Sequence, residues 1–302
     1  MIALLAPGQG SQTPGMLTPW LELPGALDQV EQWSKASGLD LVRLGTTATA
    51  EEITDTSITQ PLVVALTLLA YDELTKRGHL NAKTTVVAGH SVGEIAAYAI
   101  AGVISADDAV ALAATRGAEM AKACALDPTG MSAVLGGDEA EVLERLEALE
   151  LVPANRNAVG QIVAAGRITA LEKLAEDPPA KARVRQLATA GAFHTHFMSP
   201  AQEAYAAAAA AIAPTEPTTT LLSNFDGSPV ASGADAMDKL VNQLTSPVRW
   251  DLCTEYFKTA DVQAVVELPP SGALSGIAKR EMRGVTNHAL KTLEDLDALA
   301  EL

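Results

Sequence analysis

The sequence TTVVAGHSVGEIAAYAIA, residues 84–101, connects two apolar runs through a turn that has glycine on both sides. Residues 84–88 are rich in β-branched side chains and predict a buried strand, and residues 95–101 predict an apolar helix. A strand, a sharp turn and a helix in succession are typical of an α/β sheet covered on both faces. The apolar run at residues 2–6, which ends in a glycine-rich turn at residues 7–12, predicts another buried strand.

The turn itself is the G-x-S-x-G pentapeptide Gly89-His90-Ser91-Val92-Gly93. A serine on a sharp strand-to-helix turn exposes its hydroxyl, and the flanking glycines remove side chains that would clash in so tight a bend. The serine also stands at a helix N-terminus, where free N–H groups favour an oxyanion. The pattern predicts Ser91 as a nucleophile, whereas the plainer interpretation is a glycine-rich turn with an incidental serine.

A serine nucleophile needs a base, and the chain has five histidines. Polar turns account for His79 and His288, and His90 adjoins the serine, so its side chain points elsewhere on the turn. His194 and His196 follow the serine in the chain order of hydrolase-like sites, and the residues alone leave both open as the base. A metal site at this histidine pair is not favoured, because no third ligand is spaced nearby.

Arg116 is the most informative single residue. A helix is predicted after Ser105, with Asp108 completing a capping box. Arg116 falls on the apolar stripe of this helix, where an arginine stays charged and needs an anionic partner. Two interpretations are open: a salt bridge inside the fold, or a clamp for a substrate carboxylate.

Residues 131–187 predict the order strand, helix, strand, strand, helix, strand, which is the ferredoxin-like arrangement. We therefore expect an α/β fold with an α/β-hydrolase-like large domain of residues 1–126 and 193–302. A ferredoxin-like small subdomain of residues 127–192 is inserted into it. Two further helices are predicted, one over residues 60–74 with Pro61 in its first turn, and one after Ser199, with this serine as the cap.

Composition excludes several classes of protein. The 302 residues include 37 acidic and 21 basic side chains, and the net charge of −16 argues against nucleic-acid binding. A 48% apolar content excludes disorder. Two cysteines cannot make a disulfide framework, and no apolar run reaches the length of a membrane span or a signal peptide. We expect a cytoplasmic protein with no membrane contact.

Three signatures together resemble one enzyme family. They are Pro7-Gly8-Gln9-Gly10-Ser11-Gln12, the pentapeptide followed by Glu94, and Arg116, 25 residues after Ser91. The combination is similar to the malonyl-CoA:acyl carrier protein transacylases of type II fatty-acid synthesis, relatives of polyketide acyltransferase domains. The resemblance implies transfer of a malonyl group from malonyl-CoA to the phosphopantetheine thiol of acyl carrier protein. It implies a malonyl-serine intermediate, no metal or other cofactor, and a monomer.

The resemblance also implies roles for single residues. Ser91 is the acylated nucleophile, and His194, in Ala192-Phe193-His194, is the base in preference to His196. The backbone N–H groups of Gln9 and Val92 form the oxyanion hole. The backbone carbonyl of Gln243 orients the imidazole, which explains why no triad aspartate stands out in the sequence.

Selectivity follows from the same comparison. Arg116 binds the free carboxylate of the malonyl group, and Phe193 excludes a methyl branch, as a phenylalanine at this place does in related polyketide domains; a core phenylalanine is the plainer interpretation. Residues 155–157 and 223–227 resemble loops of the family, although asparagine-rich turns explain them equally well.

Two other functions fit part of the pattern. A serine esterase or thioesterase uses the same turn, and a noncatalytic module that binds carrier protein would keep the same fold. Acyl carrier proteins are acidic, so a chain of charge −16 needs a local basic patch to bind one. The candidates are Lys181-Arg183-Arg185 and Lys279-Arg280-Arg283, either of which also reads as a solvated face.

Overall fold

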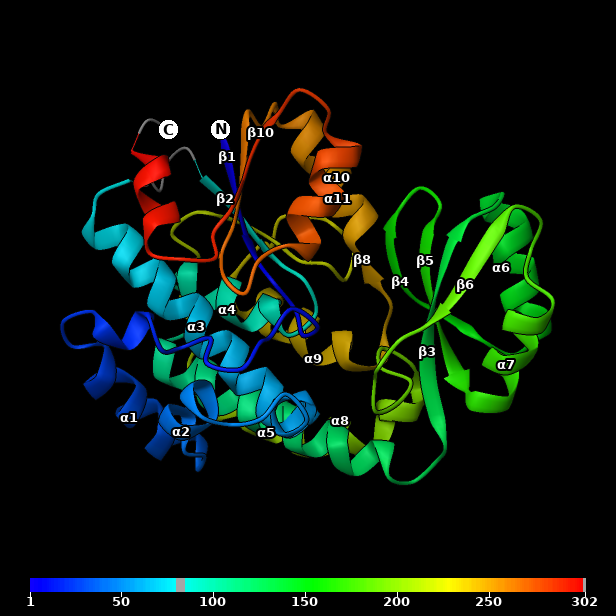
Figure 1. Cartoon of the computed structure of the whole chain (residues 1–302), viewed down its shortest axis with the longest axis horizontal. Coiled ribbons are helices and arrows are strands. Elements are labelled where there is room, and N and C mark those ends of the chain that lie inside the picture. The colour runs from blue at the N-terminus through cyan, green and yellow to red at the C-terminus, as the bar shows by residue number, and fades with distance from the viewer. Residues whose placement is uncertain (80–84, 301–302) are drawn as a thin grey trace.

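The computed structural model describes residues 1–79 and 85–300, and it is built around two β-sheets (Figure 1). The first sheet is parallel throughout, in the order β10-β9-β1-β2-β7. Its strands are β1 (Ile2–Ala6), β2 (Thr85–Gly89), β7 (Thr220–Leu222), β9 (Ala264–Glu267) and β10 (Thr286–Ala289). Because β1 and β2 are parallel and in register, the turn after β1 and the turn after β2 lie at the same edge.

Helices cover both faces of the parallel sheet. Leu4 and Val87 belong to an apolar core with α3, α4 and α5, whereas their neighbours Leu5 and Ala88 belong to a second core with α10 and α11. The helices are α3 (Thr56–Lys76), α4 (Gly93–Ile100), α5 (Ala106–Cys124), α10 (Trp250–Thr259) and α11 (Ala273–Glu281). The strands are therefore apolar at successive positions, as expected for a parallel sheet buried on both sides.

The second sheet has the order β6-β3-β5-β4-β8 and stands to one side of the first in Figure 1. Its strands are β3 (Thr129–Gly136), β4 (Val152–Ala158), β5 (Gln161–Arg167), β6 (Ala182–Gln186) and β8 (Val248–Arg249), and its helices are α6 (Glu139–Ala148) and α7 (Ile168–Glu176). Residues 129–186 follow the predicted ferredoxin-like order. A separate small core of Val134, Leu146 and Leu171 joins this sheet to α6 and α7.

The opposite face of the second sheet is turned toward the rest of the protein, since Met131 and Val163 belong to the core that contains α3, α4 and α5. The short strand β8 comes from the C-terminal part of the chain, yet it pairs in parallel with β4, with Val248 opposite Asn155. The α/β fold with a ferredoxin-like insertion is confirmed. The division at residues 126/127 and 192/193 stays a prediction.

Two predicted helix starts were wrong in detail. Helix α3 begins at Thr56, a turn before the predicted start, because the Asp55 side chain caps it by accepting from the Ser57 N–H at 2.8 Å. Pro61 therefore lies inside the helix rather than in its first turn.

Helix α8 (Ser199–Ala210) has a proline in its first turn as predicted, but Ser199 does not cap it. The short 3₁₀ helix η4 (His196–Met198) runs directly into α8, so the side-chain cap stands earlier: the Thr195 hydroxyl accepts from the Phe197 N–H at 3.2 Å.

Two smaller expectations also differ from the structure, and a third is not tested. Residues 155–157 lie on β4 rather than in a loop, and His288 lies on β10 rather than in a turn. Thr84, predicted to start a strand, lies outside the described residues. The remaining helices include α1 (Ala26–Ser37), α2 (Leu41–Thr46), α9 (Gly233–Asn242) and the 3₁₀ helix η5 (Gln243–Thr245). Within residues 1–79 and 85–300, no helix has both the length and the apolarity that a membrane span requires.

Candidate active site

Ser91 sits on the predicted sharp turn, between β2 and α4. Its backbone has a left-handed φ of 54°, which few residues other than glycine adopt without strain. Both glycines of the pentapeptide are required by close backbone contacts. A Cβ on Gly89 would lie 2.1 Å from the Gly93 carbonyl oxygen, and a Cβ on Gly93 would lie 2.2 Å from that of Ala6. The turn therefore holds the serine at the carboxyl edge of the parallel sheet.

His194 lies against this serine. Its Nε2 is 2.7 Å from Ser91 Oγ, and its Nδ1 is 2.9 Å from the backbone carbonyl oxygen of Gln243. A carbonyl only accepts, so Nδ1 carries the proton and Nε2 presents its lone pair to the serine hydroxyl. Burial, and then the positive charge of Arg116, lowers the pKa of His194 to about 3. The imidazole is neutral at pH 7 and is arranged to accept the serine proton.

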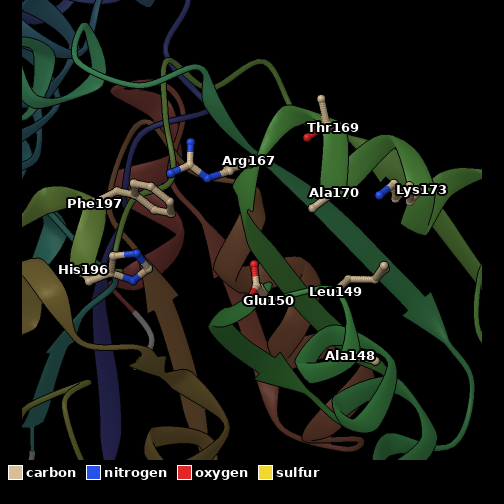
Figure 2. A pocket seen from close by; sticks show the side chains of 9 residues that line it. All are labelled: Ala148, Leu149, Glu150, Arg167, Thr169, Ala170, Lys173, His196 and Phe197. Carbon is tan, nitrogen blue, oxygen red and sulfur yellow. The ribbon is translucent and has the colours of Figure 1, made fainter.

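The other candidate histidines lie elsewhere. His196 is exposed, stacks on the Phe197 ring at 4.2 Å between centroids, and lines a separate cavity of about 580 Å³. Figure 2 shows it in that cavity beside Phe197, whose ring lies 5.5 Å from the Arg167 guanidinium. His90 turns away from the serine, and its Nε2 lies 2.9 Å from Asn157 Oδ1 on β4. The structure thus brings one histidine, His194, to the nucleophile.

Arg116 is buried beside the nucleophile. It is 1% exposed, and its guanidinium donates to Gln60 Oε1 at 2.8 Å and to Gln243 Oε1 at 2.9 Å. One terminal nitrogen also lies 3.5 Å from Ser91 Oγ. Among the described residues it has no ion pair, and its Nε has no acceptor. The interior salt bridge considered above is therefore absent from the described residues, and burial lowers the pKa of this arginine.

The predicted oxyanion donors lie at the same sheet edge. The His90 N–H donates to the Ala6 carbonyl at 3.0 Å, which ties the turn after β1 to the turn after β2. A Cβ on Gly8 would lie 2.8 Å from the His90 carbonyl oxygen, so the chain next to Gln9 passes very close to the pentapeptide. No acceptor among the described residues takes the backbone N–H of Gln9 or Val92. Both groups are available to a ligand.

Phe193 precedes the histidine and is only 5% exposed. It belongs to the large core that includes residues of α3, α4 and α5. Its position next to His194 is compatible with a role in selectivity, and its burial is compatible with packing alone.

Three polar residues of the site were given no role from the sequence: Gln60 on α3, Glu94 on α4 and Asn224 after β7. All three are 0% exposed. Glu94 Oε1 accepts from the Asn224 N–H at 2.6 Å, and its other oxygen accepts from Gln243 Nε2. A signal for Glu94 was present, because a carboxylate in an apolar helix is as unexpected as the arginine at position 116.

The two basic segments predicted from sequence lie along one rim. On the second sheet, Leu135 of β3 pairs with Gln161 of β5 and with Arg183 of β6. These three side chains lie on the face of the sheet that is turned toward the parallel sheet. The Arg280 guanidinium on α11 donates to Gln161 Oε1. Arg183 and Arg185 have no ion pair within the described ranges. Two exposed apolar side chains belong to the same sheet: Leu135, 40% exposed, lies between Gln161 and Arg183, and Val159, 83% exposed, lies in the turn between β4 and β5.

Comparison with known proteins gives a consistent result. The acyl transferase domain family matches residues 4–293. The malonyl CoA-acyl carrier protein transacylase of Mycobacterium tuberculosis is 73% identical over 302 residues, which cover 100% of both chains. The crystal structure of MCAT from the same organism superposes with a TM-score of 0.97 over 99% of both chains.

A more distant solved relative is a malonyl-transacylase in complex with a type II PKS acyl-carrier protein. It is 28% identical and has a TM-score of 0.93 over 99% of both chains. The family match covers far more than half of this chain, and the mycobacterial relative matches it from end to end. The chain therefore belongs to the acyl transferase domain family and, within it, to the malonyl CoA-acyl carrier protein transacylases.

Proposed function

We propose that this protein transfers a malonyl group from malonyl-CoA to the phosphopantetheine thiol of an acyl carrier protein, through an ester on Ser91. One observation carries the proposal: Ser91 Oγ lies 2.7 Å from a neutral imidazole nitrogen and 3.5 Å from a nitrogen of a buried guanidinium that has no ion pair among the described residues. The first activates a nucleophile, and the second recognises an anionic acyl group.

In the first half-reaction, His194 Nε2 takes the Ser91 proton while Oγ attacks the thioester carbonyl of malonyl-CoA. The free N–H groups of Gln9 and Val92 stabilise the oxyanion of the tetrahedral intermediate. The carbon–sulfur bond then breaks, and the imidazolium returns its proton to the leaving CoA thiolate. The Gln243 carbonyl holds the imidazole in the required tautomer by accepting from Nδ1.

The second half-reaction is the reverse with a different thiol. His194 takes the proton of the carrier's phosphopantetheine thiol, and the sulfur attacks the ester carbonyl on Ser91. Collapse of the intermediate breaks the bond to Oγ, and the imidazolium protonates the serine again. Between the two halves, the malonyl ester persists until an acceptor thiol arrives, which is a ping-pong mechanism.

Arg116 supplies the selection. The malonyl carboxylate is separated from the reacting carbonyl by one methylene, so a group held at Ser91 brings it next to the guanidinium. An acetyl group would leave that buried charge without an anionic partner. We propose Phe193 as a second filter that crowds an α-methyl branch on the acyl group.

The carrier docks, in this proposal, on the rim formed by Arg183, Arg185 and Arg280. Arg183 and Arg185 lie on the face of the second sheet that is turned toward the parallel sheet, Arg280 reaches Gln161 on that sheet from α11, and the exposed Leu135 lies between Gln161 and Arg183. An acidic carrier surface fits such a rim even though the whole chain carries a charge of −16.

Intact-mass measurement tests the function. After incubation with malonyl-CoA alone, the enzyme is expected to carry a lasting malonyl group, and addition of holo acyl carrier protein should move it to the carrier. Ser91→Ala is the matched control and should show neither product. Release of free malonate at the same rate with and without carrier would indicate a thioesterase and would overturn the proposal.

A further inference from the structure

Glu94 is a buried carboxylate for which the mechanism above has no use. It lies in the first turn of α4, three residues after the nucleophile, and is 0% exposed. Its Oε1 accepts from the Asn224 N–H at 2.6 Å, and its Oε2 accepts from Gln243 Nε2. No ion pair with Glu94 is found in residues 1–79 or 85–300. A carboxylate held in this way needs a reason, since burial of a charge is costly.

The side chain of Gln243 connects this carboxylate to the substrate-binding arginine. Its Nε2 donates to Glu94 and, at 3.2 Å, to the Ser91 carbonyl oxygen. Its Oε1 accepts from Arg116 at 2.9 Å. The amide thus stands between the buried anion and the buried cation, with its NH₂ group toward the first and its oxygen toward the second.

Only one orientation of this amide satisfies its neighbours. A carboxylate only accepts and a guanidinium only donates. If the amide turned by 180°, two oxygens would face each other at Glu94, and two N–H donors would face each other at Arg116. The negative charge on Glu94, together with the Ser91 carbonyl oxygen, therefore favours the orientation in which Gln243 Oε1 holds the guanidinium beside Ser91.

We propose that Glu94 is a positioning residue for Arg116, which acts through the Gln243 amide and thereby contributes to selection of a carboxylate-bearing acyl group. Glu94 also supplies the counter-charge of the buried guanidinium without contacting it. A direct salt bridge would occupy the guanidinium face that the substrate needs, whereas an intervening amide orients the cation and leaves that face free. The inference rests on the proposed function, because it assigns the malonyl carboxylate to Arg116.

The test compares malonyl-CoA with acetyl-CoA as acyl donors to holo acyl carrier protein. Glu94→Gln keeps the size of the side chain and removes the charge that orients the amide. We expect the ratio of kcat/KM for malonyl-CoA to that for acetyl-CoA to fall about tenfold. Combined with Gln243→Met, which removes both polar ends of the amide, Glu94→Gln should cause no further fall in that ratio.

The chain offers a matched control. Glu267 is also 0% exposed and accepts from the backbone N–H groups of Gly272, Leu274 and Ser275, none of which belongs to the turn around Ser91. Glu267→Gln should reduce thermal stability and leave the substrate ratio unchanged. If Glu94→Gln does not fold, Glu94→Asp, which keeps the charge but withdraws it by one methylene, should show a smaller fall in the same ratio.

The outcomes separate the two proposals. A wild-type enzyme that forms no malonyl-carrier would overturn the proposed function. If the wild-type enzyme forms malonyl-carrier but the Glu94 variants keep the wild-type substrate ratio, only the role of Glu94 is overturned. An equally large effect of Glu94→Gln in the Gln243→Met background would show that Glu94 does not act through the amide, and would also overturn the inference.

Discussion

A terminal guanidinium nitrogen of Arg116 lies 3.5 Å from Oγ of Ser91, and the two residues reach this contact from different elements, α5 and the turn before α4. An unpaired cation in the interior destabilises a fold. Its place beside an activated hydroxyl is therefore better explained by a ligand than by packing. The hydrogen bonds it makes go to the amide oxygens of Gln60 and Gln243, which orient the cation without removing its charge.

Replacement of Arg116 by alanine should depress malonyl transfer far more than acetyl transfer. Loss of a buried, charge-assisted contact costs about 3 kcal/mol, or roughly a hundredfold in kcat/KM. Acetyl-CoA makes no such contact, so it is the internal control for misfolding. Initial rates with both donors at one carrier concentration give the ratio. Equal losses for the two donors would contradict the clamp.

The buried imidazole of His194 predicts a pH-dependent stability. Its pKa is lowered from 6.5 to about 3 on folding, so between these values only the unfolded chain takes up a proton. Its contribution to the free energy of unfolding is therefore complete above pH 6.5 and declines as the pH falls toward 3. Relative to His194→Gln, the wild type should lose about 2 kcal/mol of unfolding free energy between pH 7.5 and pH 5. Urea unfolding at both pH values measures this, and a constant difference would refute it.

The sequence was sufficient for features that depend on neighbouring residues. The turn around Ser91 requires glycine at positions 89 and 93 for steric reasons that any G-x-S-x-G turn shares, so the motif alone predicted it. The stripe that buries Arg116 follows from helical periodicity in the same way. The start of helix α3 was predicted one turn too late, because it depends on a single hydrogen bond from the Ser57 N–H to the Asp55 side chain. Hydrophobic periodicity contains no signal for such a bond.

The surroundings of Arg116 could not be predicted, because they depend on contacts between distant parts of the chain. Gln60 is 56 residues away from it and Gln243 is 127 residues away. Glutamines have no spacing rule that would pair them with an arginine. A fold is needed to bring α3, α5 and η5 to one point.

Phe193 offers a test of the second filter. Phe193→Ser should raise the ratio of methylmalonyl to malonyl transfer about tenfold, since a pocket discriminates one methyl group by about 1–3 kcal/mol. The side chain is 5% exposed, so the variant should also lose about 3 kcal/mol of stability through the cavity. Phe197→Ser, in the separate cavity, is the matched control. An unchanged methylmalonyl ratio in the Phe193 variant would assign that ring to packing alone.

The basic rim predicts a kinetic separation of the two substrates. Arg183→Glu combined with Arg185→Glu should raise KM for acyl carrier protein about tenfold at low salt, because like charges at an encounter surface slow association. KM for malonyl-CoA should be unchanged, and added salt should reduce the defect. Lys35→Glu combined with Lys122→Glu, an equal change of charge at exposed positions on α1 and α5, is the control. A similar rise in that control would indicate net charge rather than a docking surface.

A final prediction concerns the pH dependence of the malonyl half-reaction. Burial raises the pKa of Glu94 to about 7, and the groups that face it from α4, α5, α8 and α10 are Tyr98, Arg116, Tyr205 and Cys253. Arg116 is the cation among them, and these four groups include no second carboxylate. When Glu94 takes up a proton, the negative charge that favours the NH₂ end of Gln243 is lost, and the amide orientation that holds Arg116 is selected less strongly.

We therefore expect kcat/KM for malonyl-CoA to decline below about pH 7, where half of Glu94 is protonated. His194 cannot account for such a decline, because its own pKa is near 3. Glu94→Gln lacks the titrating group, so its kcat/KM for malonyl-CoA should be low and independent of pH between 5.5 and 8. With acetyl-CoA, kcat/KM of the wild type should decline less than with malonyl-CoA. Stopped-flow rates of enzyme acylation would measure all three profiles. A Glu94→Gln profile that keeps the wild-type decline would place the titrating group elsewhere, since the carboxylate bonded to Gln243 would then be gone.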